Sequence, residues 1–517
     1  MTSSQWRLRA NAAFFGLLER RALRALDRQQ WRKAVAGTQA ASEFASKCHP
    51  GRFASLPLER ALDSAAQALL PAETRFPTGT SIESVLHVMT KTPFPGGHTT
   101  WVRRWVERDT ARTHSLVVTE ESAEVVAGDL RAAIEHSGGE VLGLDGAADP
   151  LAAAAIVRQL SGEHDAVIVS THPWDVVPSL AFSFAGRRPV IRLDHADHRF
   201  WIGCGVSDVI VEYRLAGERC CRIRRGISSK RLVLSPLPID DDSEAASSLT
   251  EISPAVGEAR RAEARRRLGI EPSTFVLLSV GAAYKFKPMH GVGYLEYVLP
   301  ALRDLPQLLV IAVGPASCRA WDAAGASTDP PRRLWAVGPQ RVLKPYLAAA
   351  DAFLNPIPIG SETATWEAAM AGLPIICRRP ASEDLALVTS DPEDFGGAAL
   401  APDSPQALLS VISRLSSDPD ECRRLGATAR QVVLTRSGVG WRSSAEQAYE
   451  MALALGPASV DELSSEADGS AVDEVLSSMR SSNPLRTVAA SEIRARPVLS
   501  RAARSVLVPT SRRRGNK

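Results

Sequence analysis

The sequence predicts an α/β protein with two Rossmann-like domains that face one cleft. Short apolar runs alternate with helical segments in two separate stretches of the chain, and three runs of the second stretch each end in a glycine. This alternation is typical of parallel sheets covered by helices on both faces. Along the 517 residues we expect five segments, in the order 1–79, 80–240, 241–270, 271–455 and 456–517.

The first segment, 1–79, is predicted to be an α-helical extension, because apolar residues recur at helical spacing from Phe14 to Phe44. The second, 80–240, is expected to form the first Rossmann-like domain. Its apolar runs are candidate strands, at 85–89, 115–118, 165–170, 189–193, 209–211 and 232–234. Segment 241–270 is polar and is interpreted as a linker and a leading helix. The second domain, 271–455, has candidate strands at 275–280, 308–313, 334–337 and 373–377, and a helix at 443–454 is expected to return to the first domain.

The last segment, 456–517, is predicted to be a disordered tail, since it is rich in serine, lacks aromatic residues and separates its charges into blocks. Six acids lie in 456–485, and nine bases lie in 486–517. The tail is interpreted either as a solvated segment or as a basic segment that binds an acidic partner. At most, it would make peripheral contact with a membrane.

Composition excludes several classes of protein. With 61 Lys and Arg against 58 Asp and Glu, the net charge is only +3, so no specific nucleic-acid partner is expected. Seven cysteines form no CxxC pair and are interpreted as reduced thiols of a cytoplasmic protein. No apolar run approaches the roughly 18 residues of a spanning helix, and the apolar patch at 11–18 lacks the features of a signal peptide.

The most informative segment is 351–374, in which a strand-like run ends at Pro356 and Pro358. A helix then opens at Gly360-Ser361-Glu362-Thr363. Small residues at a helix start leave backbone N–H groups free at the positive end of the helix dipole, and this arrangement suits a phosphate or diphosphate.

Glu367 follows Thr363 by four residues, about 6 Å further along the helix axis. That separation is near the distance from a diphosphate to the ribose hydroxyls of the same nucleotide, and a carboxylate is a natural acceptor for two ribose hydroxyls. The alternative interpretation is an ordinary surface glutamate on a capped helix.

The segment resembles the nucleotide-binding signature of GT-B glycosyltransferases, in which a Pro-rich strand end, a Gly/Ser/Thr turn and the run EAAMAGLP at 367–374 follow one another. The resemblance implies that Glu367 binds the ribose of a sugar nucleotide. It also implies that the turn holds the diphosphate, through Gly360, Ser361, Glu362 and Thr363. Many retaining members carry a second glutamate where this chain has Ile359. Retention and inversion of the sugar's configuration therefore both stay open.

Two further loops extend the resemblance. Val337 and Gly338 occupy the place where the family receives the nucleotide base. After the strand 275–280, Gly281 and Lys287 match the family's glycine and its lysine for the diphosphate, whereas Ala282 stands where the family has an arginine. Lys285, on the same loop, is predicted to supply the missing charge.

The first domain offers acceptor and catalytic candidates. The loop of Gly96, Gly97 and His98 resembles the acceptor-side loop of GT-B enzymes. His172 and His195 follow adjacent strands, so one of them is predicted to take a proton from a sugar hydroxyl while a nearby carboxylate, Asp197, holds the imidazole. A structural histidine pair is the alternative. A metal at His195 and His198 would lack a third ligand at sensible spacing, so no metal is expected.

These residues predict a glycosyltransferase that moves a sugar from a nucleotide-diphospho-sugar to a hydroxyl of a glycan, lipid or small-molecule acceptor, without a cofactor. Two alternatives remain open. One is a catalytically silent GT-B module that binds a glycan or a protein. The other is a sugar-nucleotide epimerase, whose acid and base carboxylates this chain does not plainly supply.

Overall fold

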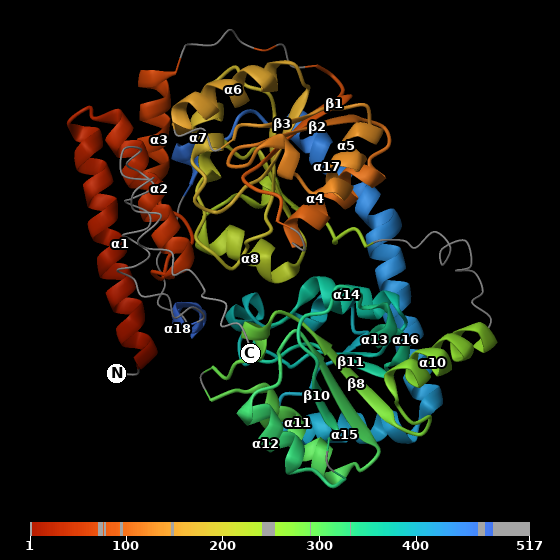
Figure 1. Cartoon of the computed structure of the whole chain (residues 1–517). Helices are drawn as coiled ribbons and strands as arrows, with labels where there is room; N and C mark the ends of the chain where they lie inside the picture. The colour runs from red at the N-terminus through yellow and green to blue at the C-terminus, as the bar shows by residue number, and fades with distance from the viewer. Residues whose placement is uncertain are drawn as a thin grey trace, which may run out of the picture.

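A computed structural model describes residues 3–70, 76, 79–93, 97–145, 149–239, 254–289, 291–330, 332–463 and 471–478. Figure 1 shows two α/β domains that face each other, with a group of N-terminal helices beside the upper one. This arrangement confirms the predicted fold class of two Rossmann-like domains with a helical extension. Gly96 and residues 240–253 lie outside the described residues.

The N-terminal extension consists of α1 (Ser3–Asp27), α2 (Trp31–Lys47) and α3 (Leu56–Leu69). Gly37 lets α2 approach α1 closely, because a Cβ at this position would lie 3.1 Å from the Cα of Ala22. Phe15 and Phe44 are buried in a core that these helices share with one face of the first sheet. The extension is therefore an integral part of the first domain's packing.

The first sheet is parallel, with seven strands in the order β3-β2-β1-β4-β5-β6-β7. Its strands are nearly all buried, as their apolar sequences require. The strands are β1 (Ser84–Met89), β2 (Thr113–Val118), β3 (Val141–Gly143), β4 (Ala166–Ser170), β5 (Val190–Leu193), β6 (Val209–Glu212) and β7 (Leu232–Leu234). The helices of this domain are α4 (Gly97–Arg108), α5 (Gly128–His136), α6 (Pro150–Gly162), α7 (Val177–Phe182) and α8 (Leu215–Arg224).

The second sheet is also parallel, with the order β10-β9-β8-β11-β12-β13. Its strands are β8 (Phe275–Val280), β9 (Leu308–Val313), β10 (Leu334–Ala336), β11 (Ala352–Leu354), β12 (Ile375–Ile376) and β13 (Ala399–Leu400). Its helices are α10 (Pro254–Leu268), α11 (Tyr294–Asp304), α12 (Arg319–Ala326), α13 (Lys344–Ala349), α14 (Glu362–Met370), α15 (Pro405–Ser417) and α16 (Pro419–Leu434).

Helix α17 (Trp441–Ala454) returns to the first domain, as the sequence predicts. The Trp105 indole N–H donates to the Tyr449 hydroxyl at 2.9 Å, and this hydroxyl donates to Asp109 at 2.7 Å. The chain therefore crosses between the two domains twice. Within the described residues, no helix combines the length and apolarity that crossing a bilayer requires.

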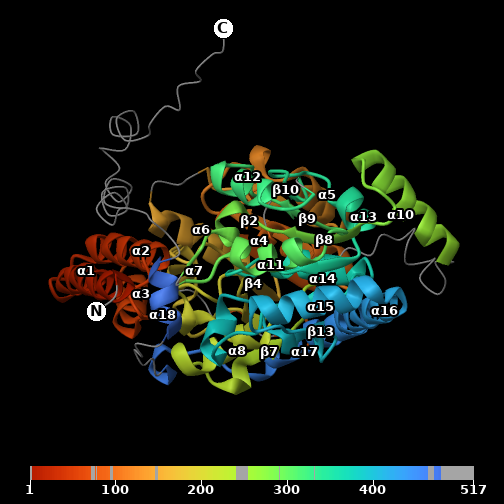
Figure 2. The ribbon, with the colours of Figure 1, turned by 90° about the horizontal axis from the view of Figure 1, so that it is seen from below.

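Part of the predicted disordered tail is ordered. Residues 471–478 form α18 (Ala471–Ser478), which Figure 2 shows beside the N-terminal helices. Val472 and Leu476 are buried with Phe53, and the buried Asp473 accepts from Arg224 at 3.0 Å. The prediction of disorder is wrong for this helix, because its apolar face packs with Phe53, a contact that composition does not reveal. Residues 464–470 and 479–517 lie outside the described residues.

Candidate active site

Two backbone hydrogen bonds and a glycine shape the start of α14. The Ser361 N–H donates to Oδ1 of Asn355 at 2.7 Å, and the Gly360 N–H donates to the carbonyl of Val388 at 3.1 Å. Gly360 is required here, since a Cβ would lie 2.2 Å from Oγ of Ser390. The N–H groups of the first helical residues, from Glu362 onward, have no partner inside the helix. The positive end of the helix dipole is therefore available to an anion.

Lys285 lies at this helix start. It belongs to the turn after β8, and its Nζ donates to the Gly360 carbonyl at 2.6 Å. Burial lowers the pKa of Lys285 to about 8, although Glu362 opposes the shift. Gly281 allows the approach, because a Cβ there would lie 3.2 Å from Cδ of Lys285. Lys287, in contrast, is exposed.

Glu362 faces a cation that sequence reasoning missed. Arg214 follows β6 and lies 3.7 Å from Oε1 of Glu362, so the first domain supplies positive charge at the start of α14. It also donates to the carbonyl of Leu387 at 2.7 Å, in the 3₁₀ turn η5 (Glu383–Leu387) of the second domain. Burial raises the pKa of Glu362, and Arg214 opposes that rise. In the sequence, only the position of Arg214 just after a strand end could have indicated that it belongs to the site.

Asp197 does not hold the imidazole of His195. Its carboxylate accepts from Arg214 and contacts Nδ1 of His198 at 3.0 Å. Burial alone would raise the pKa of Asp197, but these two partners hold it well below its usual range. The carboxylate that was predicted to hold the His195 imidazole therefore pairs with Arg214 and His198 instead.

The structure brings three candidate histidines together. The rings of His98 and His195 stack with centroids 4.7 Å apart, and His172 lies 6.0 Å from His98. His98 comes from the start of α4, directly after Gly97, while His172 and His195 follow β4 and β5. Burial lowers the pKa of His98, and burial together with the neighbouring imidazoles lowers that of His195 well below the usual value. His98 and His195 are therefore neutral near pH 7.

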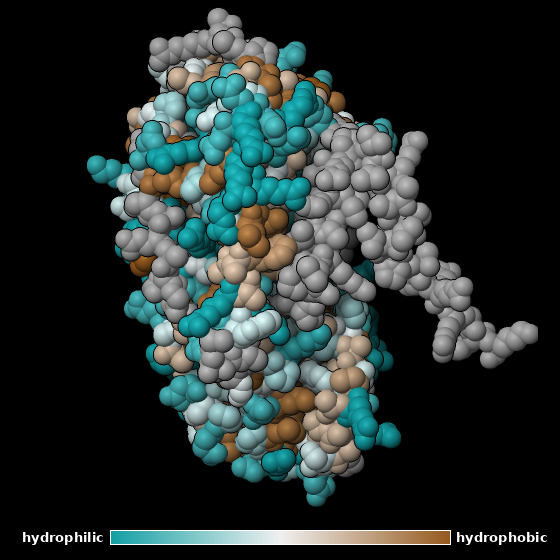
Figure 3. Space-filling view, turned by 90° about the vertical axis from the view of Figure 1, so that its left-hand side faces the viewer, coloured by the Kyte–Doolittle hydropathy of each residue, from teal (hydrophilic) through white to brown (hydrophobic). Residues whose placement is uncertain are grey.

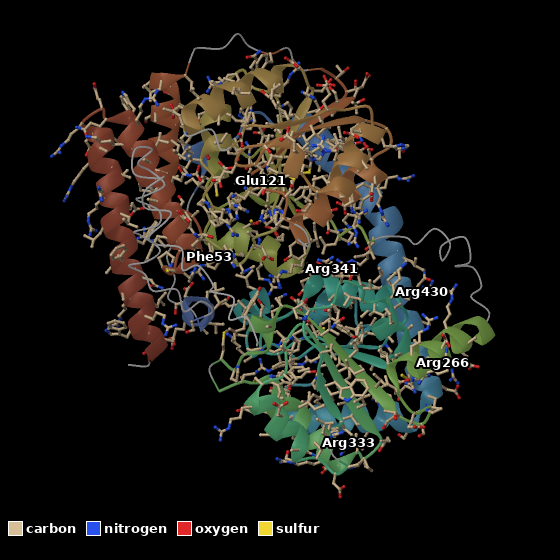
Figure 4. All side chains as sticks on the ribbon, viewed as in Figure 1. Phe53, Glu121, Arg266, Arg333, Arg341 and Arg430 are labelled. Carbon is tan, nitrogen blue, oxygen red and sulfur yellow. The ribbon has the colours of Figure 1, made fainter. Side chains whose placement is uncertain are left out.

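Glu367 lies at the junction of the two domains. Its Oε1 is 3.2 Å from Nη2 of Arg104, on α4 of the first domain. The pair lines a cavity of about 1010 Å³ together with Arg341, which Figure 4 labels where the two domains face each other. Much of this cavity runs along α10 and α13 to the amino ends of the strands, where parallel sheets do not place ligands. Glu367 and Arg104 line this cavity at the domain junction.

Val337 and Gly338 follow β10. Gly338 has a φ of +72° and accepts from the Gly314 N–H at 2.9 Å, so the two strand-end glycines of β9 and β10 are joined. The Val337 carbonyl accepts from Nε2 of Gln340 at 2.9 Å.

Among the described residues, one group could bring three metal-ligating atoms within 4.8 Å of one another, namely Asp194, Glu212 and Cys221. Arg225 lies 3.8 Å from Asp194 and donates to Sγ of Cys221 at 3.5 Å. Burial raises the pKa of both Glu212 and Cys221, which keeps these groups protonated. The cluster is then a neutral buried network in which Arg225 balances Asp194.

No protein-family model matches this chain, and no curated protein matches it. Solved structures do resemble it. HepE of Anabaena, in complex with UDP, is 18% identical, with a TM-score of 0.50 over 70% of this chain and 99% of its own. A Rickettsia africae glycosyltransferase is 12% identical, with a TM-score of 0.53 over 72% of this chain and 98% of its own. An O-GlcNAc transferase of Thermobaculum terrenum is 12% identical, with a TM-score of 0.52 over 87% of this chain and 84% of its own. These likenesses confirm the GT-B fold.

Proposed function

We propose that this chain transfers a sugar from a nucleotide-diphospho-sugar to a hydroxyl group of an acceptor. The observation that carries the proposal is the position of Glu367. It lies one helical turn beyond the open amide end of α14, at the face where the two domains meet. The fold supports the proposal, since HepE, which shares it, was solved with UDP.

In the proposed donor complex, the diphosphate binds at Gly360–Thr363 and Lys285, and the ribose hydroxyls donate to Glu367. Helix dipole and ammonium charge both act where the leaving diphosphate gains negative charge. Val337 and Gly338 receive the base, and Arg214 adds positive charge from the opposite domain. Contact between the domains would exclude water, which otherwise hydrolyses the donor.

In the proposed reaction, the acceptor hydroxyl loses its proton to the neutral His195 imidazole. Its oxygen bonds to the anomeric carbon of the sugar, and the bond from that carbon to the diphosphate breaks. His98 and His172 are proposed to orient the acceptor, because the His98 ring stacks on His195 and the His172 ring lies against His98. This chemistry needs no metal. The cytoplasm is the proposed compartment, in line with seven free cysteines.

The test is a thermal-shift screen of nucleoside diphosphates, followed by calorimetry on the best ligand and assays of donor hydrolysis and transfer. A ligand that binds the folded state raises the melting temperature by mass action. We expect one or more nucleoside diphosphates to do so, and we expect the matching sugar nucleotide to be turned over. Failure of every nucleotide to bind would refute the proposal. Binding without turnover across donor and acceptor panels would identify a silent module.

A further inference from the structure

The helical extension carries charge out of proportion to its length. Residues 1–33 contain eight basic and two acidic side chains, a net charge of +6, whereas the entire chain has only +3. The remainder of the protein is therefore net negative. The basic residues of this segment are Arg7, Arg9, Arg20, Arg21, Arg24, Arg28, Arg32 and Lys33.

Several of these cations face one groove. A cavity of about 580 Å³ between α1 and α2 is lined by Arg21, Arg24, Arg28 and Lys33, and no acidic residue is among its lining residues in the described part of the chain. Glu19 points elsewhere, because its carboxylate accepts from the Ser55 hydroxyl at the start of α3. The groove is therefore lined by basic side chains of both helices.

The same helix exposes large apolar side chains. Trp6 is 64% exposed and Leu17 is 57% exposed. They are eleven residues apart, which is close to three helical turns, so they share one face of α1. Arg20 and Arg24 continue this face and are exposed. Figure 1 shows α1 as the outermost helix of the extension, and the view onto that side in Figure 3 shows hydrophobic and hydrophilic residues intermixed.

We propose that this outer face of α1, together with the basic groove, docks on an anionic lipid bilayer. Tryptophan and leucine insert at the level of the headgroups, and arginines beside them bind lipid phosphates. A soluble polyanion would engage the cations but leave Trp6 and Leu17 in water, so the combination of features favours a membrane. The proposal does not depend on the reaction proposed above.

Cosedimentation of the full chain with vesicles tests the proposal. One set of vesicles is phosphatidylcholine alone, and the other contains about one third phosphatidylglycerol. We expect binding to the anionic vesicles only, weakening as salt is added. The triple variant Arg20→Gln, Arg24→Gln, Arg28→Gln should bind about 100-fold more weakly, since each surface cation contributes roughly fivefold. Trp6→Ser should weaken binding by about tenfold without changing the charge.

The matched control removes the same charge from the tail, as Arg512→Gln, Arg513→Gln, Arg514→Gln, and should retain binding close to that of the unmodified chain. Circular dichroism melts check that each variant is folded. The proposal is overturned if the unmodified chain does not bind anionic vesicles. It is also overturned if the α1 variants bind them as tightly as the unmodified chain does. It is also overturned if only the tail variant loses binding, or if the chain binds heparin but no vesicle.

Discussion

Arg104 of the first domain and Glu367 of the second form an ion pair across the domain junction, with 3.2 Å between Nη2 and Oε1. Arg104 is on α4, whose first turn carries His98, and Glu367 is on α14, whose first turn lies beside Lys285. The pair thus connects the helix of the proposed acceptor site with the helix of the proposed donor site. Arg104 is almost fully buried while Glu367 is 28% exposed, so a ligand can approach the carboxylate from the solvent side.

The first prediction concerns Glu367→Gln. If Glu367 accepts the ribose hydroxyls, this variant should bind a nucleoside diphosphate about 10- to 100-fold more weakly, because hydrogen bonds to a charged group contribute roughly 1.5–3 kcal/mol. Inorganic pyrophosphate has no ribose, so its affinity should be unchanged. Isothermal titration calorimetry measures both.

Glu450→Gln is the matched control, since Glu450 is an exposed residue of α17 far along the chain from α14. It should leave both affinities unchanged. Equal nucleotide affinity in Glu367→Gln and in the unmodified chain would remove Glu367 from the donor site.

The second prediction is a pH dependence that Lys285 imposes on diphosphate affinity. Its pKa is lowered to about 8 by burial, with Arg214 contributing and Glu362 opposing. A bound diphosphate favours the protonated amine, so the affinity is fully present below pH 8 and is lost as the pH rises through that value. The dissociation constant should then increase up to tenfold per pH unit. Lys285→Arg keeps its charge at these pH values and should give a flat profile between pH 7 and pH 9.5. The same slope in both proteins would contradict the assignment.

The third prediction concerns the histidine cluster. Because burial and the adjacent imidazoles lower the pKa of His195, its neutral form persists below pH 6.5, and the turnover number should not fall between pH 7 and pH 6. His195→Ala should reduce turnover about 10²- to 10⁴-fold while nucleotide affinity is retained, as expected for loss of a general base. His136→Ala, an exposed substitution at the end of α5, should change neither. If the turnover number instead falls with protonation near pH 6.5, and still does so in His195→Ala, then a residue other than His195 is the general base.

Features set by local pattern were predictable from sequence. Strand ends, a small-residue helix start and the spacing to Glu367 all lie within short segments, and the topology of parallel sheets brings strand ends to one edge. His98, His172 and His195 meet for the same reason, since each follows a strand of the first sheet. The predicted strands of the first sheet are confirmed, and only β3 was missed, because its sequence Val141-Leu142-Gly143 is partly exposed and ends in a glycine.

Partners distant in sequence were not predictable. Arg104 meets Glu367 across 263 residues, and Arg214 reaches the carbonyl of Leu387 across 173. These contacts depend on how the two domains are docked, which no local pattern encodes. Helix α18 was missed for a related reason, because its short apolar face is buried by packing with Phe53, which is distant in sequence.

The fourth prediction compares two glycines inside helices. In water-exposed helix interiors, alanine is favoured over glycine by about 1 kcal/mol. At Gly16 of α1, an added Cβ would meet only the end of the Arg20 side chain, at 3.2 Å, and that side chain can move. At Gly426 of α16, a Cβ would lie 1.9 Å from the carbonyl oxygen of Gly372, directly after α14. Backbone atoms must shift there.

Gly16→Ala should therefore raise the melting temperature slightly, while Gly426→Ala should lower it, since overpacking costs about 1–3 kcal/mol and exceeds the gain in helix propensity. The second variant has a further consequence. Because α16 packs against the end of α14 through Gly426, a displaced α14 would shift Glu367, and nucleotide affinity should fall together with stability. Calorimetric melts and nucleotide titrations measure the two effects. A Gly426→Ala protein that melts higher and binds nucleotide normally would show that this contact does not position α14.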